Sequence, residues 1–531
     1  MPEFRWTVKA LENGRDIEFS GSHDLTNGVN HITCELPSCM ILEVKGTFLS
    51  TVMDDERIFM NGYQTWTFSP EYTKRSVMRG VNGLSPRLIN HFSLDRYGDY
   101  HFTDYSLRRG VTHGFSFCYF RRRNHYRLFA SLNEEPGYTI FEYDARRSLM
   151  TVKRDCSGLK TEGTYSLFDL YVADGNEQEV FDGWFANMPI RRIPAKPLYG
   201  YSSWYNRYQD ISEEAIRQDL SGCRNIFQKG DLFQIDDGWE PKVGDWLVPD
   251  EKKFPKGLRP LVDEIHESGF EAGLWLAPFI AEKESRLYQD HPDWFYKVNG
   301  NDWSNGCNWS GFYSLDIDHP EVQSYLETVF DKVFNEWGFD LVKLDFLYAA
   351  APFGNERETR AGRMIRAMRF LRKLCGNHAI LGCGVPVMPA FGLVEYCRVS
   401  CDVSLDWNDK LHMQIIHRER PSTRNAIVNT VLRRVLNNRA YISDPDVFFL
   451  RDENLKLSKK RKRMLATIGA LLGGVFLTSD DPSSYTDEMK EAYQYYRHLT
   501  NARVTGVHLL DRGVVIDYIL DGKPDSITFK G

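Results

Sequence analysis

The chain has 531 residues, of which 42% are hydrophobic and 14% aromatic, and its formal net charge is −7. This length predicts a core domain with one or two accessory domains, and the apolar content excludes a chain that is disordered throughout. The mild negative charge gives no electrostatic basis for binding nucleic acid or an anionic membrane surface.

The N-terminus and the cysteines indicate the cellular setting. The opening segment MPEFRWTVKALENG has no basic stretch followed by an apolar one, and no window of the chain approaches the length and apolarity of a membrane span. The ten cysteines are scattered, without CxxC pairs or a disulfide-like framework. We therefore expect a reduced, cytoplasmic protein.

Residues 1–190 read mostly as strands separated by turns. Residues 41–46 and 165–172 mix apolar and polar positions over short lengths, and Glu12-Asn13-Gly14 is a typical turn sequence. A single helix, over about 177–188, closes this region. The pattern predicts an N-terminal antiparallel β-sandwich, and the proline-rich segment 189–197 marks its boundary with the next domain.

From residue 191 to about 500 the pattern switches between strands and helices. Eight short β-rich segments recur, most of them separated by helical stretches, and this order predicts a central (β/α)8 TIM barrel. The segments are LYGYSSW, LFQIDDGW, EAGLWLAPF, LVKLDFLY, AILGCGVP, CRVSCDV, AYISDPDVF and GVFLTSDD. Residues 501–531 read as a few strands, which predicts a short C-terminal β region.

The helices between these segments vary in clarity. The clearest is 320–337, where apolar residues form one stripe after Pro320. Other helices are expected near 213–225, 258–266, 357–375, 424–438 and 459–472. The fifth crossover, 387–396, is too short for a normal barrel helix. The basic run 459–463 opens an amphipathic segment, so we interpret it as a solvated helix face rather than a nucleic-acid patch.

Two of the predicted strands end in a lone aspartate, Asp345 and Asp402. Active sites of (β/α)8 barrels lie at the C-terminal strand ends, and alternate residues of a strand share a face. Lys343 therefore accompanies Asp345, and Arg398 accompanies Asp402. On the second strand Asp236 shares the face of Gln234, and Asp237 begins the following loop. Two carboxylates that face one cavity are what glycoside hydrolysis requires.

These charges predict different roles for the two aspartates. Lys343 favours the ionised form of Asp345, which suits a nucleophile. Asp402 would be the general acid, which must hold a proton near neutral pH. Arg398 should lower its pKa, whereas the negative charge of Asp345 should raise it, and the sequence leaves open which effect is larger.

Other interpretations of these residues remain open. A strand-end aspartate can cap a helix or form a salt bridge, and Lys343 could instead form a Schiff base. Asp444-Pro445-Asp446 could line the pocket, but a turn is the preferred interpretation; Asp480-Asp481-Pro482 reads as a turn or a cap. The histidines show no HExxH or similar spacing, so we expect no metal and no cofactor.

Over most of its length the chain resembles glycoside hydrolase family 36, whose members are mostly retaining α-galactosidases. FQIDDGWEPKVGDWL resembles the family motif in which paired aspartates bind the O4 and O6 hydroxyls, which implies that role for Asp236 and Asp237. KLDFLYA resembles the nucleophile motif, which implies Asp345 as nucleophile and Lys343 as a hydroxyl contact. LGCGVPVMPAFGLVEYCRVSCDVS resembles the segment that ends in the acid/base, which implies that role for Asp402, with Arg398 beside it.

The resemblance extends to the walls of the pocket. Trp204 in SSWYN and Trp275 in GLWLAPF match aromatic wall positions, and NGYQTW resembles a loop by which the N-terminal sandwich contributes Trp66. Cys383 in LGCG resembles the position near the sugar O2, although it could be a small buried strand residue. Residues Cys401-Asp402-Val403 depart from the usual surroundings of the acid/base, and the C-terminal region is shorter than in the family.

The expected function is a metal-free, retaining exo-α-galactosidase that acts on α-galactoside oligosaccharides, with a homo-oligomer as one option for its assembly. An α-N-acetylgalactosaminidase or a galactosyl-transferring relative on the same scaffold is the alternative, because one or two substitutions around O2 could change the preference. A sugar-binding protein on a degenerate barrel is the alternative from another class.

Overall fold

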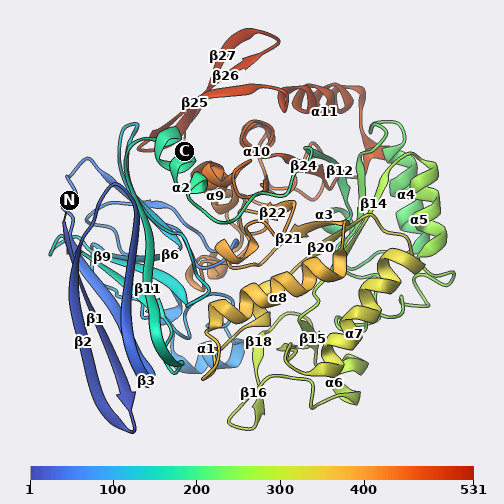
Figure 1. The fold of residues 1–531 in the computed structure, drawn as a ribbon. Coiled ribbons are helices and arrows are strands. Elements are labelled where there is room, and N and C mark those ends of the chain that lie inside the picture. The colour runs from blue at the N-terminus through green and yellow to red at the C-terminus, as the bar shows by residue number, and fades with distance from the viewer. Residues whose placement is uncertain (1, 531) are drawn as a thin grey trace.

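The computed structural model describes residues 2–530 and contains three regions along the chain (Figure 1). A curled antiparallel sheet formed by the N-terminal strands lies beside an eight-stranded parallel barrel, and the last three strands form a small separate sheet (Figure 1). This is the predicted fold class. We propose the predicted domain boundaries near residues 190 and 500, since extended chain follows the N-terminal region and a turn precedes the last sheet.

The N-terminal sheet has two long strands, and the other strands pair along them. Its core contains Phe4, Ile41 and Phe168, while Phe117 and Trp184 belong to the cluster that continues into the barrel. The strands are β1 (Glu3–Glu12), β2 (Arg15–Asp24), β3 (Gly28–Leu49), β4 (Arg57–Met60), β5 (Glu71–Tyr72), β6 (Val111–Phe115), β7 (Phe117–Arg122), β8 (His125–Ser131), β9 (Tyr138–Asp144), β10 (Leu149–Asp155) and β11 (Lys160–Asn176). The sheet therefore has one face of its own and one that rests on the barrel.

Helix α2 (Glu177–Ala186) closes this region, as predicted. Asn176 accepts a hydrogen bond from the backbone of Glu179, whose side chain in turn accepts one from the backbone of Asn176, so the helix begins with a capping box. Its residues Phe181 and Trp184 are fully buried. A short helix, α1 (Pro86–Phe92), lies between β5 and β6.

All eight predicted barrel segments contain a strand of one parallel sheet. The strands are β12 (Leu198–Ser202), β13 (Leu232–Ile235), β14 (Glu271–Leu276), β20 (Leu341–Leu344), β21 (Ala379–Gly382), β22 (Tyr396–Arg398), β23 (Ile442–Asp444) and β24 (Val475–Thr478). They pair in chain order, and β24 pairs with β12. The Gly474 amide donates to the Ser443 carbonyl at 3.0 Å, which closes the barrel between β23 and β24.

The helices follow the prediction closely. They are α3 (Trp204–Arg207), α4 (Glu213–Cys223), α5 (Arg259–Glu267), α6 (Arg286–Asp290), α7 (Pro320–Asp331), α8 (Arg360–Cys375), α9 (Thr423–Arg433), α10 (Lys459–Leu472) and α11 (Asp487–Leu499). The fifth crossover holds only the 3-10 turn Met388–Ala390, as its length required. Helices α3, α6 and α11 were not predicted. In the basic run, Lys462 is buried and donates to the Leu450 carbonyl at 2.8 Å, while its neighbours are exposed or half-buried.

The third crossover carries extra strands before α7. The pairs are β15 (Ile280–Glu282) with β19 (Phe312–Ser314), β18 (Ser304–Gly306) with β19, and β16 (Lys297–Val298) with β17 (Asn301–Asp302). The loop between β18 and β19 reaches the mouth of the barrel, where it lines a cavity.

The C-terminal sheet consists of β25 (Arg503–Leu510), β26 (Gly513–Leu520) and β27 (Lys523–Lys530), in the region predicted to be β. Among the described residues, no helix has the length and apolarity to cross a membrane.

Candidate active site

A cavity of about 720 Å³ lies at the C-terminal ends of the barrel strands. Eight of the ten predicted site residues line it: Trp66, Trp204, Asp236, Asp237, Trp275, Lys343, Asp345 and Asp402. The other two, Cys383 and Arg398, lie behind lining residues. The fold therefore places predicted site residues from five barrel segments and from the N-terminal region around one cavity.

Asp345 follows β20 directly and receives two hydrogen bonds. The Trp275 indole Nε1 donates to its Oδ2 at 3.1 Å, and the Phe346 amide donates to its Oδ1 at 2.9 Å. Phe346 has φ of 52°, a left-handed conformation that is uncommon for a bulky residue. The turn that follows the strand thus holds one carboxylate oxygen in place while Trp275, on the adjacent strand β14, holds the other.

Lys343 ties the fourth strand to the second. Its ammonium lies 3.0 Å from Asp236 Oδ2, and both side chains are almost fully buried. Burial opposes the charge of Lys343, but the carboxylates of Asp236 and Asp345 outweigh it and raise the pKa of the ammonium. A Schiff-base lysine must lose its proton before it can attack a carbonyl, so this environment disfavours that interpretation.

Asp237 is held by residues that the sequence did not indicate. The Gln209 amide donates to its oxygens at 3.2 and 3.0 Å, and the Trp309 indole donates at 3.1 Å. Burial raises the pKa of Asp237, and burial together with Asp237 raises the pKa of the adjacent Glu240. This corner of the cavity therefore offers a carboxyl group that is already oriented by two donors.

Asp402 lies in the loop after β22, and a buried charge network surrounds it. The Arg398 guanidinium contacts Asp402 at 2.8 Å, Asp444 at 3.0 Å and Asp446 at 3.0 Å. About a third of the Asp402 side chain faces the cavity, and the rest is enclosed by protein. Burial raises the pKa of Asp402 to about 6, with Arg398 acting against it and Asp446 adding to it.

That value answers the question that the sequence left open. Burial, rather than the charge of Asp345, is the main reason that the pKa of Asp402 lies above its ordinary range in spite of Arg398. The preferred interpretation of Asp444 and Asp446 as a simple turn is incomplete, because both are buried and divide the charge of Arg398 between them. Asp446 also accepts hydrogen bonds from Tyr205 and from the Val403 amide, so it fixes the loop that carries Asp402.

Trp66 reaches the cavity from the N-terminal region. Its indole Nε1 lies 3.2 Å from Cys383 Sγ, and its ring meets Phe346 edge-on at 4.9 Å between centroids. Cys383 is fully buried, so it supports Trp66 from behind instead of facing the cavity. Burial raises the pKa of its thiol well above the ordinary range.

Several lining residues lie in loops for which the sequence offers no periodic signal. They are Tyr97, Gln209, Asn308, Trp309, His417 and Glu419. The Tyr97 hydroxyl donates to Asn308 Oδ1 at 2.5 Å, and its ring stacks on His417 at 4.8 Å. One signal could have identified Trp309 in part, since sugar sites use exposed aromatic rings, but nothing in its neighbourhood distinguishes it from a core tryptophan.

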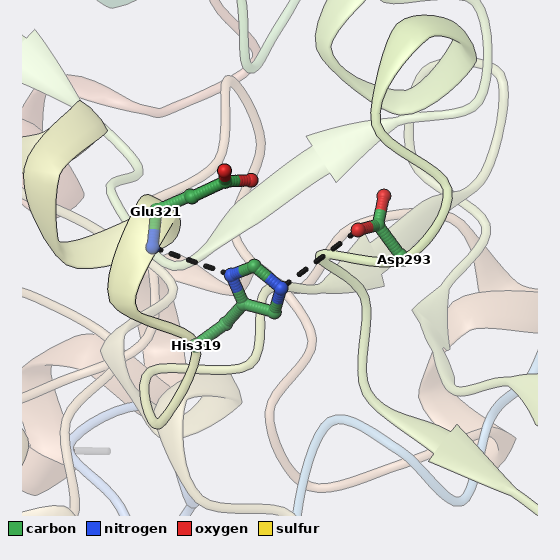
Figure 2. Close-up of side chains that lie close together, drawn as sticks. All are labelled: Asp293, His319 and Glu321. Atoms are coloured by element: carbon green, nitrogen blue, oxygen red, sulfur yellow. Dashed lines mark hydrogen bonds and ion pairs between the residues drawn. The ribbon is translucent and has the colours of Figure 1, made fainter.

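Two further groups of side chains have structural explanations. Asp481 accepts a hydrogen bond from the Ser483 amide at 2.9 Å and caps the turn that follows it, as the cap interpretation expected. Asp293, His319 and Glu321 bring potential metal ligands within 4.8 Å of one another (Figure 2). His319 Nδ1, however, accepts the Glu321 amide at 3.3 Å and caps α7, so this ring nitrogen already has a partner in the fold.

Known proteins share this barrel. Residues 196–374 match the family model described as Melibiase. Over these residues, which are fewer than half of the chain, it is similar to the melibiase family. The matched segment runs from the first barrel strand to α8, so it includes Asp236, Lys343 and Asp345 but ends before Asp402.

Relatives in this family are α-galactosidases. That of Escherichia coli is 31% identical over 219 residues, 39% of this chain and 30% of the relative. α-Galactosidase 2 of Pediococcus pentosaceus is 43% identical over 187 residues, 34% of this chain and 25% of the relative, and α-galactosidase 1 of that organism is 30% identical over 151 residues, 27% and 20%. The aligned segments thus cover only 20–30% of the length of these curated relatives.

Solved structures extend the similarity beyond the barrel. The α-galactosidase TtGalA of Thermus thermophilus, in complex with p-nitrophenyl α-D-galactopyranoside, has a TM-score of 0.75 and 26% identity, over 94% of this chain and 99% of that one. AgaA of Geobacillus stearothermophilus, a variant in complex with raffinose, has a TM-score of 0.60 at 13% identity, over 97% of this chain and 72% of that one, and shows the shared fold alone. The similarity therefore includes most of the N-terminal sheet as well as the barrel.

Proposed function

We propose that this chain is a member of the melibiase family and a retaining exo-α-galactosidase. The observation that carries the proposal is the unequal environment of two carboxylates in one cavity. Asp345 accepts two hydrogen bonds and lies near the Lys343 ammonium, whereas burial raises the pKa of Asp402 to about 6. A nucleophile requires a carboxylate that is held in place, and a general acid requires a carboxyl group with a raised pKa, so the two environments suit these two roles.

The reaction would proceed by double displacement. Asp345 attacks the anomeric carbon, and the bond to the leaving oxygen breaks as that oxygen takes the proton of Asp402. The neutralisation of Asp345 in the glycosyl-enzyme removes a negative charge near Asp402. This lowers the pKa of Asp402, so its ionised form is favoured and can act as the base. Asp402 then takes a proton from water, which attacks the anomeric carbon and releases the sugar with its configuration retained.

The sugar would be held by charged groups and by aromatic walls. Asp236, Asp237 and Lys343 offer hydrogen-bond partners to hydroxyl groups at the closed end of the cavity. Trp66, Trp204 and Trp275 enclose it. Relatives in the family have been solved with stachyose and raffinose, which supports a proposal of α-galactoside oligosaccharides as substrates of this chain.

A groove beside Asp402 gives room for the rest of such a substrate. It has a volume of about 1420 Å³ and shares Trp204, Asn308 and Asp402 with the cavity. Tyr208, which is 41% exposed, lines it and contacts Trp204 edge-on at 5.1 Å. Because the general acid must face the leaving group, the groove at Asp402 is the place for the leaving saccharide.

The reaction class is tested by release of nitrophenol from nitrophenyl α-galactoside and from its 2-acetamido analogue, by wild type and Asp345→Ala. Rapid turnover of the galactoside that is lost in the variant supports the proposal. Preference for the acetamido substrate would instead indicate an α-N-acetylgalactosaminidase. Saturable galactose binding without turnover of either substrate would indicate a sugar-binding protein.

The leaving-group groove is tested separately with Tyr208→Ala. We expect kcat/KM for a galactosyl oligosaccharide to fall about fivefold, since an aromatic contact contributes on the order of 1 kcal/mol. α-Galactosyl fluoride has no leaving saccharide and serves as the control substrate, for which the variant should equal wild type. Equal losses on both substrates would show that Tyr208 acts on the cavity as a whole.

A further inference from the structure

The barrel contains a fully buried arginine whose charge no carboxylate neutralises. Arg433, at the end of α9, has no exposed surface, and within residues 2–530 no ion pair to it is found. Burial lowers its pKa to about 10. A guanidinium in such a place is costly unless its N–H groups find acceptors.

Nearly all of those hydrogen bonds go to one loop of the N-terminal region, residues 61–69. Arg433 Nε donates to Asn61 Oδ1 at 3.0 Å. Nη1 donates to the Thr65 carbonyl at 2.5 Å, and Nη2 donates to the Ser69 hydroxyl at 3.1 Å and to the Gln64 carbonyl at 3.2 Å. The planar guanidinium thus binds three acceptors before Trp66 and one after it.

A second residue of α9 holds the same loop. Asn429 lies one helical turn before Arg433 and therefore on the same face. The Ser69 amide donates to Asn429 Oδ1 at 2.9 Å, and Asn429 Nδ2 donates to the Thr67 carbonyl at 3.1 Å. Asn429 is also fully buried, so the helix presents a polar face that bonds directly to the loop.

The loop in turn carries Trp66 into the cavity. Gln64 Oε1 accepts the Trp66 amide at 3.0 Å, and the Thr65 amide donates to the Val385 carbonyl at 3.0 Å. Space for the indole is tight, because a Cβ atom at Gly384 would lie 2.8 Å from it. A small displacement of the loop would therefore move the ring against Gly384, in the segment after β21, and alter the wall that the ring forms.

We propose that Arg433 is a positioning residue, which sets the place of Trp66 in the sugar-binding cavity from the opposite side of the 61–69 loop. Stability does not explain it, since a buried charge with only neutral acceptors costs desolvation free energy that an apolar residue of similar volume would avoid. Its fork of donors instead defines the loop geometry, and it does so without touching the substrate. This inference rests on the proposed function for its activity readout.

The neighbouring residue provides a matched control. Arg434 also comes from the barrel, is 8% exposed, and pairs with Glu177 of α2, so it too connects the barrel to the N-terminal region. It makes no hydrogen bond to residues 61–69; its other partners are the Val431 carbonyl and Tyr126. Loss of Arg434 therefore weakens the contact between the two regions without releasing Trp66.

The test is a double-mutant cycle on kcat/KM with nitrophenyl α-galactoside, using Arg433→Lys, Trp66→Ala and the double variant. Arg433→Lys keeps the charge but loses the fork, and we expect it to lower kcat/KM about tenfold, while Arg434→Lys stays within about twofold of wild type. In the Trp66→Ala background, Arg433→Lys should add less than about twofold. Losses that multiply, or no loss in Arg433→Lys, would overturn the proposal.

A second measurement does not depend on turnover. In protein labelled with 5-fluorotryptophan, the ¹⁹F resonance of Trp66 is assigned by its absence in Trp66→Phe. Arg433→Lys should shift or broaden that resonance and Arg434→Lys should not; an unmoved resonance contradicts the positioning role even if the enzyme acts on another sugar. If Arg433→Lys fails to fold, Asn429→Ala takes its place in both measurements, with a smaller effect in the same direction.

Discussion

Asp345 follows β20 directly and is held by donors, whereas Asp402 lies in a loop after β22 and is surrounded by charges. The first carboxylate receives a backbone amide from its own turn and an indole N–H from the next strand. The second contacts one guanidinium that two other carboxylates also bind. Hydrogen-bond donors at fixed positions favour the ionised form of Asp345. Because Arg398 is shared among three carboxylates, it opposes the effect of burial on the pKa of Asp402 less strongly.

The comparison explains how one cavity can contain a base-like and an acid-like aspartate. If Arg398 faced Asp402 alone, the ion pair would favour the charged form and the proton needed by the leaving group would be lost. Asp444 and Asp446 reduce that effect by binding the other edges of the guanidinium. The functional difference therefore arises from the neighbours of the two aspartates and not from the residue type.

The largest expected effect comes from removal of Asp345. Asp345→Ala should lower kcat by about 10⁴-fold or more, because no other group can form the covalent intermediate. Addition of azide should then yield β-galactosyl azide, since the anion attacks from the face that Asp345 occupied. Formation of the α-azide in this variant would mean that Asp402 is the nucleophile and Asp345 the acid/base.

The loss of activity on removal of Asp402 should be smaller than that on removal of Asp345, and its size should depend on the leaving group. For a disaccharide we expect Asp402→Ala to lower kcat/KM by about 10³-fold, as general acid catalysis contributes about 10²–10⁴-fold. For α-galactosyl fluoride, whose leaving group needs no proton, the loss in kcat/KM should be about tenfold or less. Equal losses on both substrates, measured side by side, would contradict the assignment of Asp402 as general acid.

The pH profile gives a subtler test of the same contrast. Asp402 has to be protonated for the first step, and its pKa is raised to about 6, so kcat/KM for a disaccharide should fall as pH rises above about 6. The fall should approach tenfold per pH unit, and the profile for α-galactosyl fluoride should lack it. A disaccharide profile that stays flat to pH 8 would mean that Asp402 is not the proton donor.

Much of the fold could be predicted because its signals are local. Alternating and apolar runs identified all eight barrel strands, and the strand-end aspartates followed from the rule that β/α active sites form at the C-terminal ends. The family resemblance and the three-region fold are confirmed. Trp66 was reached through that resemblance, as nothing local in NGYQTW indicates that it meets residues more than 300 positions later.

What the sequence could not supply are contacts between distant loops. Trp309 and Gln209 hold Asp237, yet they lie in segments without periodicity. Asp444 and Asp446 read as a turn because Asp-Pro-Asp favours one; their binding to Arg398 requires β22 and β23 to be adjacent. Arg433 lay within the helix expected near 424–438 with nothing to distinguish it, and its proposed role depends on a loop from another region of the chain.

The smallest effect that we predict distinguishes the two carboxylates behind Arg398. Asp446→Asn removes a charge that raises the pKa of Asp402 and frees an edge of Arg398, so both changes should lower that pKa. The fall in kcat/KM at high pH should therefore begin at lower pH. The substitution itself is compatible with the backbone, because Asn tolerates the left-handed φ of 75° at this position. Asp444→Asn is the matched control, because it also frees Arg398 but lies outside the main influences on Asp402. A larger shift in Asp444→Asn than in Asp446→Asn would mean that the guanidinium, and not the nearby carboxylate, sets the proton affinity of Asp402.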